Sequence, residues 1–299
     1  MPDNTLTPQS WEAFVGQEKL KRRLQIKIDA ALERMEPLGH ILFHSSPGAG
    51  KSSIGMLIAQ QLGVGFTTVD MPIKIKALNK LLMETDGVLM LDETHRLKKS
   101  DQENLLPVLW KGIVQFDNGK RVKLPPRVTI IGATTEIQSI IKPLRDRFHY
   151  VAKFDPYTDE DMAKIVTRMA TRVDLTPTTE ECKALGRASA GTPRQARNLI
   201  LTARDIGTCD PSQVLETAGI TFDGLTEDHT EYLFALDQMG QRAGVDNLSN
   251  LTGQPKDMII ELEKLLVLKG LIMYTAKGRE LTVEGMQKIR LLREGKDGV

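Results

Sequence analysis

Short apolar runs alternate with amphipathic stretches through roughly the first half of the chain. One amphipathic stretch, residues 17–35, is expected to form a helix with lysines and arginines on its exposed face. Its apolar face consists of Leu20, Leu24, Ile28, Ala31 and Leu32. This alternation is typical of a parallel α/β sheet covered by helices. It predicts an α/β domain over residues 1–153, with strands at 40–44, 66–70, 87–92, 128–133 and 150–154.

Residues 154–222 show only helical periodicity. Thr158 and Thr178 each precede acidic residues and an apolar repeat, which is the usual start of a helix. A third helix is expected to begin near Pro193. The pattern predicts a small helical domain over this range.

Residues 223–299 change pattern again, from helices to a hairpin. The apolar segments Leu271–Tyr274 and Leu281–Val283 flank a turn that contains Lys277 and Arg279. Helices followed by a two-stranded hairpin predict a winged-helix domain, and the two cations are candidate contacts to DNA phosphates. A hairpin with a solvated basic turn, or a winged helix that binds protein, is the alternative.

The strongest chemical motif is a phosphate loop between the predicted strand at 40–44 and a helical stretch. Glycines free the backbone so that N–H groups converge on an anion, and the lysine reaches the β- and γ-phosphates. Ser52 is a candidate magnesium ligand, and Ser45 stands where the usual motif begins with glycine, so slight strain is expected there. A chance glycine-rich turn is the alternative. The candidate nucleotide-binding residues are Pro47, Gly48, Ala49, Gly50, Lys51, Ser52 and Ser53.

A second motif follows at the end of the apolar strand at 87–92. Asp92 and Glu93 are expected at the carboxyl edge of the sheet, where open α/β sheets bind ligands. Asp92 would orient Mg²⁺ and Glu93 would act as general base on the attacking water. Thr135, or alternatively Thr134, would hold that water from the next strand end. Two solvated acids and a turn-capping threonine are the ordinary alternatives. ATP and Mg²⁺ are the expected ligands.

The composition of the chain restricts its possible partners and compartment but does not indicate a function. The chain has 299 residues, 40% of them hydrophobic, and a formal net charge of +1. This balance neither demands nor excludes nucleic acid, because binding needs only a local basic patch. Cys182 and Cys209 lack metal-ligand spacing and suit a reducing compartment. Without a signal peptide or a membrane-spanning apolar stretch, we expect a cytoplasmic protein with no membrane partner.

Several further motifs occur in a characteristic order along the chain. They are Phe14-Val15-Gly16-Gln17, Asp92-Glu93-Thr94-His95-Arg96-Leu97, Gly132-Ala133-Thr134-Thr135, Pro143-Leu144-Arg145-Asp146-Arg147-Phe148 and Gly191-Thr192-Pro193-Arg194. Over roughly residues 11–290 the chain resembles RuvB, the bacterial family of Holliday-junction branch-migration motors. The resemblance implies an AAA+ P-loop ATPase with a helical lid and a winged-helix domain. It also implies a homo-oligomer, a hexameric ring acting on four-way-junction or duplex DNA.

The resemblance assigns roles to individual residues. Arg147 matches the arginine finger, which completes the active site of a neighbouring subunit, with Arg145 beside it. Such a finger is worth ~10³–10⁵ in rate. Arg194 matches the second sensor, which contacts the nucleotide from the lid, and Phe14 and Val15 match the segment that packs on adenine. The alternatives are a surface ion-pair cluster with Asp146 for the first pair and a plain first-turn helix residue for Arg194.

The sequence departs from the family at three places. Thr94 replaces the usual isoleucine, Ser45-Ser46 replaces Gly-Pro, and the segment Gly112 to Pro126 is shorter than the family hairpin that grips RuvA. Asn118-Gly119 between alternating residues still predicts a hairpin, with its turn at 117–119. The shortness of this hairpin puts binding to a RuvA-like partner in question. A divergent relative, for example one encoded by a phage, would fit these departures.

Three functions are consistent with these residues. The first is a ring-forming, ATP-driven DNA motor for Holliday-junction branch migration or related translocation in recombination and repair. The second is a protein-remodelling ATPase, which is disfavoured because residues 71–76 carry lysines and no aromatic side chain to grip a peptide. The third is a helicase loader or clamp-loader-like ATPase, which would use ATP for assembly rather than for translocation.

Overall fold

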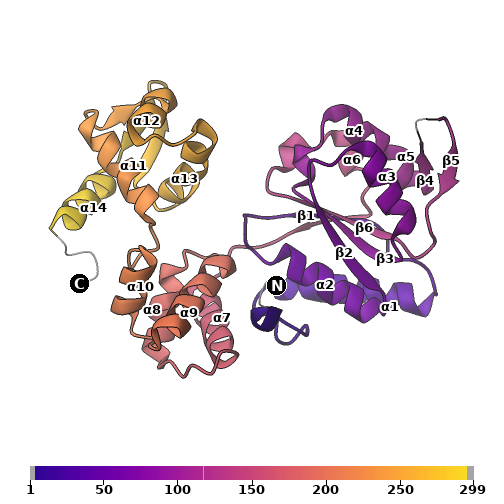
Figure 1. The fold of residues 1–299 in the computed structure, drawn as a ribbon, viewed down its shortest axis with the longest axis horizontal. Helices are drawn as coiled ribbons and strands as arrows, with labels where there is room; N and C mark the ends of the chain where they lie inside the picture. The colour runs from indigo at the N-terminus through magenta and orange to yellow at the C-terminus, as the bar shows by residue number, and fades with distance from the viewer. Residues whose placement is uncertain (1–3, 117, 295–299) are drawn as a thin grey trace. The chain divides into compact units, whose positions relative to one another are not determined.

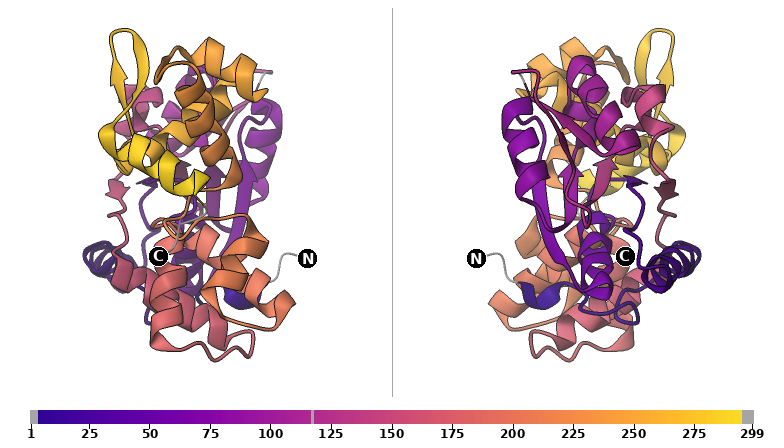
Figure 2. Two further views of the ribbon diagram at one scale, coloured as in Figure 1. Left: turned by 90° about the vertical axis from the view of Figure 1, so that its left-hand side faces the viewer. Right: turned by 90° about the vertical axis from the view of Figure 1, so that its right-hand side faces the viewer.

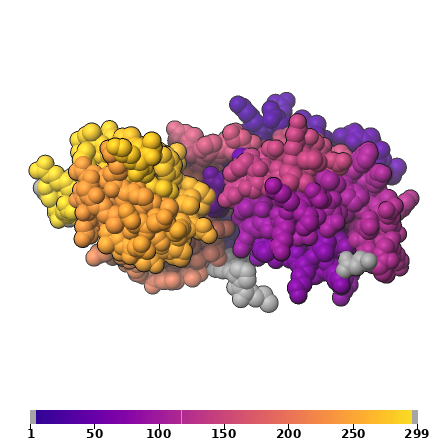
Figure 3. Space-filling view, turned by 90° about the horizontal axis from the view of Figure 1, so that it is seen from above, coloured from indigo at the N-terminus to yellow at the C-terminus, as the bar shows by residue number. Residues whose placement is uncertain are grey.

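The computed structural model describes residues 4–116 and 118–294, which divide into two compact units with the boundary between Tyr157 and Thr158 (Figure 1). Figure 3 shows the atoms of these residues in a space-filling view coloured by position in the chain. The turn predicted at 117–119 includes Asp117, which lies outside the described residues.

The first unit is built on a parallel sheet of five strands in the order β2-β3-β6-β1-β7. Every predicted strand is confirmed. The central strands β3, β6 and β1 are buried between two helical layers, whereas the edge strands β2 and β7 are largely exposed. The carboxyl ends of β1 and β3 both lie next to β6, so motifs far apart in sequence meet at one edge. The strands are β1 (Ile41–His44), β2 (Gly65–Asp70), β3 (Gly87–Asp92), β6 (Thr129–Thr134) and β7 (Tyr150–Lys153).

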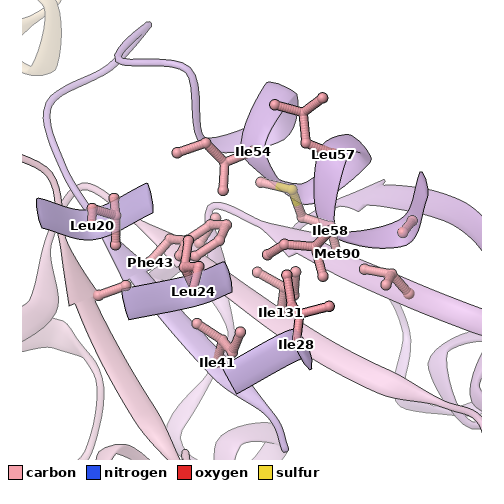
Figure 4. Close-up of a cluster of buried hydrophobic side chains, with 14 of the residues drawn as sticks. Leu20, Leu24, Ile28, Ile41, Phe43, Ile54, Leu57, Ile58, Met90 and Ile131 are labelled. Atoms are coloured by element: carbon pink, nitrogen blue, oxygen red, sulfur yellow. The ribbon is translucent and has the colours of Figure 1, made fainter. Parts of the chain in front are cut away.

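Helices cover both faces of this sheet. On one face, α1 (Glu18–Glu33) and α2 (Lys51–Leu62) pack against alternate strand residues such as Phe43 and Ile131 (Figure 4). Leu32 was expected on the buried face of α1, but it is 46% exposed because it lies beyond the edge of the stripe that contacts the sheet. The other face carries α3 (Ile75–Glu84), α4 (Lys99–Asn104), α5 (Leu106–Lys111) and α6 (Lys142–Arg145).

Shorter elements complete the first unit. The predicted hairpin is confirmed as β4 (Ile113–Gln115) paired antiparallel with β5 (Arg121–Lys123). Single 3₁₀ turns occur at η1 (Asn4–Leu6), η2 (Thr94–Arg96) and η3 (Ile137–Ser139), and the last two begin within three residues of the ends of β3 and β6.

The second unit begins with a helical bundle. Thr158 and Thr178 close capping boxes at the starts of their helices, as predicted. Gly186 allows close helix packing, since a Cβ there would lie 2.9 Å from the backbone nitrogen of Ala163. The helices are α7 (Asp159–Thr171), α8 (Thr179–Ala188), α9 (Pro193–Ile206) and α10 (Pro211–Ala218).

The remainder of the second unit has the predicted winged-helix order of elements. Its small antiparallel sheet has the strand order β8-β10-β9, and the β9–β10 hairpin projects beyond the adjoining helices (yellow in Figure 2). A separate apolar core, from Leu225 to Ile289, stabilises it. The elements are α11 (Glu227–Gln238), β8 (Arg242–Ala243), α12 (Val245–Thr252), α13 (Lys256–Leu268), β9 (Ile272–Thr275), β10 (Gly278–Leu281) and α14 (Val283–Arg293).

Candidate active site

The phosphate loop joins β1 to α2 in the conformation that the motif predicts. Gly48 and Gly50 have φ angles of 72° and 95°, which side-chain-bearing residues rarely adopt. Lys51 is buried at the start of α2, and its ammonium donates to Ser45 Oγ at 3.1 Å and to the carbonyl of Ser46 at 3.3 Å. Ser52 and Ser53 follow half-buried in the first helical turn. The loop therefore offers backbone N–H groups, a lysine and a hydroxyl at one helix N-terminus.

Ser45 does not strain the loop, contrary to expectation. It is absent from the residues with positive φ in the described chain, so the position needs no glycine. Its backbone N–H donates to the carbonyl of Thr134 at 3.3 Å, and its hydroxyl donates to the carbonyl of Ser46 at 2.9 Å. The serine thus ties the loop to the end of β6.

The segment around Phe14 lies against the phosphate loop. A Cβ on Gly50 would lie 3.1 Å from the Phe14 ring, and Val15 follows half-buried. The side-chain amide of Gln17 exchanges hydrogen bonds of 2.7 and 2.9 Å with the backbone of Asp155. This clamp fixes the predicted adenine-binding segment between the loop and the end of β7.

Tyr157 also contacts the phosphate loop. Its hydroxyl donates to the carbonyl of Ala49 at 3.0 Å. Sequence reasoning did not select Tyr157 or the side chain of Gln17. Gln17 stands within the quoted Phe14–Gln17 motif, whereas Tyr157 carries no local signal.

The acidic motif lies at the end of β3, which is separated from β1 and the phosphate loop by β6. Asp92 accepts a hydrogen bond from the backbone N–H of Glu93 at 3.0 Å, and Glu93 adopts a left-handed conformation with φ of 50°. Glu93 Oε2 lies 3.2 Å from Nδ1 of His95 and 3.4 Å from the hydroxyl of Thr135. His95, which sequence reasoning did not select, therefore orients the predicted base.

The two threonines at the end of β6 differ in their surroundings. Thr134 is fully buried, and its hydroxyl lies 3.1 Å from His95 Nδ1 and accepts from the N–H of Glu136 at 3.0 Å. Thr135 is partly exposed and contacts Glu93 directly. Both are thus linked to the acidic strand end, and their roles toward the lytic water stay predictions.

Thr94, the departure from the family signature, joins the two strands that carry these groups. It is fully buried; its hydroxyl donates to the carbonyl of Leu91 at 2.7 Å and accepts from the N–H of Ala133 at 3.2 Å. The usual isoleucine could make neither bond. The substitution therefore adds a polar crosslink beneath the site.

The predicted cations lie apart from the phosphate loop. Arg147 Nη1 donates to the carbonyl of Pro143 at 2.7 Å, and its guanidinium lies over the ring of Trp110. Within 4–116 and 118–294, no ion pair joins Arg145 or Arg147 to Asp146, so the surface-cluster alternative lacks support. A finger that acts on another subunit is expected to lie outside its own site.

The remaining predicted residues belong to the second unit. Arg194 is exposed in the first turn of α9. Lys277 is exposed in the β9–β10 turn, whereas Arg279 lies on β10 with its guanidinium 2.7 Å from the buried Glu263. Lys277 is thus the more accessible cation, and DNA contact by either residue stays a prediction.

Two features bear on the ligands of the site. Burial, followed by the charges of Lys153 and Lys51, lowers the pKa of His44 at the end of β1, so this side chain adds no charge near neutral pH. Among the described residues, no group of three or more His, Cys, Asp or Glu could hold a metal. The hydroxyl of Ser52 and the carboxylate of Asp92 are oxygen donors that suit Mg²⁺, which takes its other ligands from phosphate and water.

None of the described helices is long and apolar enough to cross a membrane.

Comparisons with known proteins agree with this geometry. Residues 6–154 match the family model described as the Holliday junction DNA helicase RuvB P-loop domain, and residues 223–290 match the RuvB C-terminal winged helix domain. A RuvB subunit of the Holliday junction branch migration complex from Mesomycoplasma hyopneumoniae is 32% identical, covering 95% of this chain and 97% of that protein. The corresponding Rubrobacter xylanophilus subunit is 34% identical, over 93% and 84%. The Thermotoga maritima RuvB branch migration motor superposes with a TM-score of 0.83 at 26% identity, covering 96% of this chain and 98% of that one.

Proposed function

The chain belongs to the RuvB family of Holliday junction branch migration ATPases, and we propose that it is an ATP-driven motor that moves DNA junctions. One observation carries the proposal: β1, which leads to Lys51, and β3, which ends at Asp92 and is followed by Glu93, flank β6 at one edge of the sheet, and His95 and Thr135 contact the general base Glu93. This arrangement fits ATP hydrolysis, because phosphoryl transfer needs positioned charge rather than covalent chemistry.

Each residue has a distinct role in the proposed reaction. The loop N–H groups and Lys51 bind the phosphates, while Phe14 and Val15 pack on the adenine. Ser52 and Asp92 would hold Mg²⁺, which when bound neutralises charge on the phosphate oxygens. Glu93 takes the proton of the attacking water, and Thr135 or Thr134 orients that water.

The proposed assembly is a hexameric ring. Arg147 would act on the nucleotide of the neighbouring subunit, and Arg194 would sense the nucleotide from the helical lid. We divide the chain into the ATPase domain (1–153), the lid (154–222) and the winged helix (223–299), with Lys277 and Arg279 as the DNA contacts. The basic hairpin residues Lys120, Arg121 and Lys123 are exposed, so a RuvA-like partner with an acidic docking surface remains compatible with the short hairpin.

The decisive experiment measures steady-state ATP hydrolysis with four-way-junction DNA, with linear duplex and without DNA. The wild-type chain should hydrolyse ATP faster with junction DNA, and Glu93→Gln should lose about 10³-fold or more in kcat while still binding ATP. Glu84→Gln, an exposed acid on α3, is the matched control and should keep wild-type rates.

A strand-exchange assay on a labelled junction then separates a motor from a loader. A motor dissociates the junction in an ATP-dependent manner that Glu93→Gln abolishes. Hydrolysis that no DNA stimulates, together with an unmoved junction, would refute the motor and favour a loader or a protein-remodelling ATPase.

A further inference from the structure

We propose that Trp110 is a positioning residue for Arg147, holding the guanidinium at the surface that meets the nucleotide of a second copy of this chain. The inference rests on the proposed function, in which Arg147 acts on a neighbouring subunit. It adds a residue that neither the motifs nor the comparisons assign.

Trp110 is exposed where a tryptophan is ordinarily buried. It lies near the end of α5 with 67% of its surface accessible, whereas Trp11 packs against the core of the first unit. The neighbours of Trp110 on α5, Val108 and Leu109, are buried and fix the helix to the sheet. The indole is therefore presented on a rigid support rather than on a mobile loop.

The exposed indole contacts the predicted finger. The guanidinium carbon of Arg147 lies 5.4 Å from the centroid of the Trp110 ring, within the range of a cation–π interaction. Residues 4–116 and 118–294 provide Arg147 with no carboxylate partner. Arg147 also donates a hydrogen bond from Nη1 to the carbonyl of Pro143. The ring and this carbonyl together restrict a long side chain that would otherwise sample many rotamers.

An aromatic partner suits an arginine finger better than a carboxylate would. A carboxylate would neutralise the guanidinium and compete with a phosphate for it, whereas the ring orders the cation and leaves its charge unneutralised. Lys111 adds a second cation, with Nζ 5.0 Å from the same ring centroid. Trp110, Lys111 and Arg147 thus form a surface with two positive charges next to one indole ring. A nucleoside triphosphate bound to another copy of the chain carries the opposite charge and would complement this surface.

Mixed assemblies test this assignment because each chain can supply a different half of the site. Chains with Glu93→Gln keep the finger but lack the base, and chains with Arg147→Ala keep the base but lack the finger. Neither alone should hydrolyse ATP efficiently, and mixing them should restore sites that combine Glu93 of one chain with Arg147 of another.

Trp110→Ala is then placed on one chain at a time. On the finger-supplying Glu93→Gln chain, it should lower the restored kcat about three- to tenfold with little change in KM, the effect of losing one cation–π contact. On the base-supplying Arg147→Ala chain, it should change kcat less than about twofold, because that chain has no finger to position. Trp110→Phe on the finger-supplying chain should retain most of the activity, since it keeps a ring. Ile26→Ala, which truncates another exposed apolar side chain, is the control for non-specific loss.

The outcomes separate the two proposals. Failure of the mixed chains to regain activity would overturn the trans-acting finger and, with it, the role of Trp110. Restored activity that Trp110→Ala leaves unchanged, or lowers equally from either chain, would overturn the Trp110 assignment alone. A loss confined to the finger-supplying chain supports positioning, because a purely structural role would not depend on which chain carries the change.

Discussion

Replacing Glu263 by glutamine should destabilise the winged-helix part of the chain strongly. Glu263 lies on α13 with 0% of its surface exposed. Its Oε1 accepts from Tyr232 Oη at 3.0 Å and Arg279 Nε at 2.7 Å, and its Oε2 accepts from Tyr274 Oη at 3.0 Å and Arg279 Nη2 at 3.1 Å. Burial, together with the hydrogen bond to this carboxylate, raises the pKa of Tyr274. The carboxylate thus links α11, α13 and both strands of the wing.

The expected loss follows from the burial of this network. Glutamine keeps the size of the side chain but removes the charge that balances Arg279 and replaces one acceptor oxygen by a donor amide. Removing one partner of a buried ion pair typically costs about 3–5 kcal/mol. The Arg279 side chain is itself 19% exposed, so the loss should lie near the lower end of this range. Glu261→Gln on the same helix breaks only a half-exposed pair with Lys264, so its effect should stay below about 1 kcal/mol.

Hydrogen–deuterium exchange read out by mass spectrometry localises the effect. In the Glu263→Gln variant, amides of α11, α13 and β9–β10 should exchange faster than in wild type, and urea denaturation should show the lost free energy. The first unit should keep its protection. A Glu263→Gln variant no less stable than the Glu261→Gln control would refute the reasoning.

Four further predictions follow from the site and its surroundings. Thr94→Val should lower the free energy of unfolding, measured in urea, by about 2 kcal/mol, because two buried backbone groups lose their hydrogen bond to the hydroxyl. Thr94→Ser keeps the hydroxyl and should retain most of the wild-type stability. His95→Ala should lower kcat for ATP about tenfold without weakening nucleotide binding, since Glu93 loses a hydrogen bond that orients it; an unchanged kcat would contradict this role. Burial, with a smaller contribution from His149, lowers the pKa of His40 from 6.5 to about 4. The folded protein should therefore keep its full stability above pH 6.5 and lose about 3 kcal/mol as the pH falls toward 4, because the unfolded chain takes up a proton at His40 first. In the His40→Asn variant, the free energy of unfolding should depend less on pH over this range. Lys277→Ala should weaken DNA binding uniformly and reduce the slope of log K against log salt by about one without changing stability, and an unchanged slope would exclude a phosphate contact there.

Local sequence determined the parts of the protein whose hydrogen bonds and periodicity span only a few residues. The phosphate loop, the acidic strand end and the capping boxes at Thr158 and Thr178 were all predictable, because each is completed by neighbours in the chain. The central strands β1, β3 and β6 were predictable for a related reason, since a strand buried on both faces is largely apolar. Their order supported the expectation that both nucleotide motifs reach one edge of the sheet.

Only the tertiary structure decided which distant side chains meet. The amide of Gln17 clamps Asp155, which is 138 positions away in the chain. Trp110 lies under Arg147, and Arg279 turns inward to Glu263 instead of lying free at the wing tip. Each of these contacts depends on how separately folded helices and strands pack. A side chain takes a distant partner only when packing brings the two within a few ångströms, and no local pattern encodes that distance.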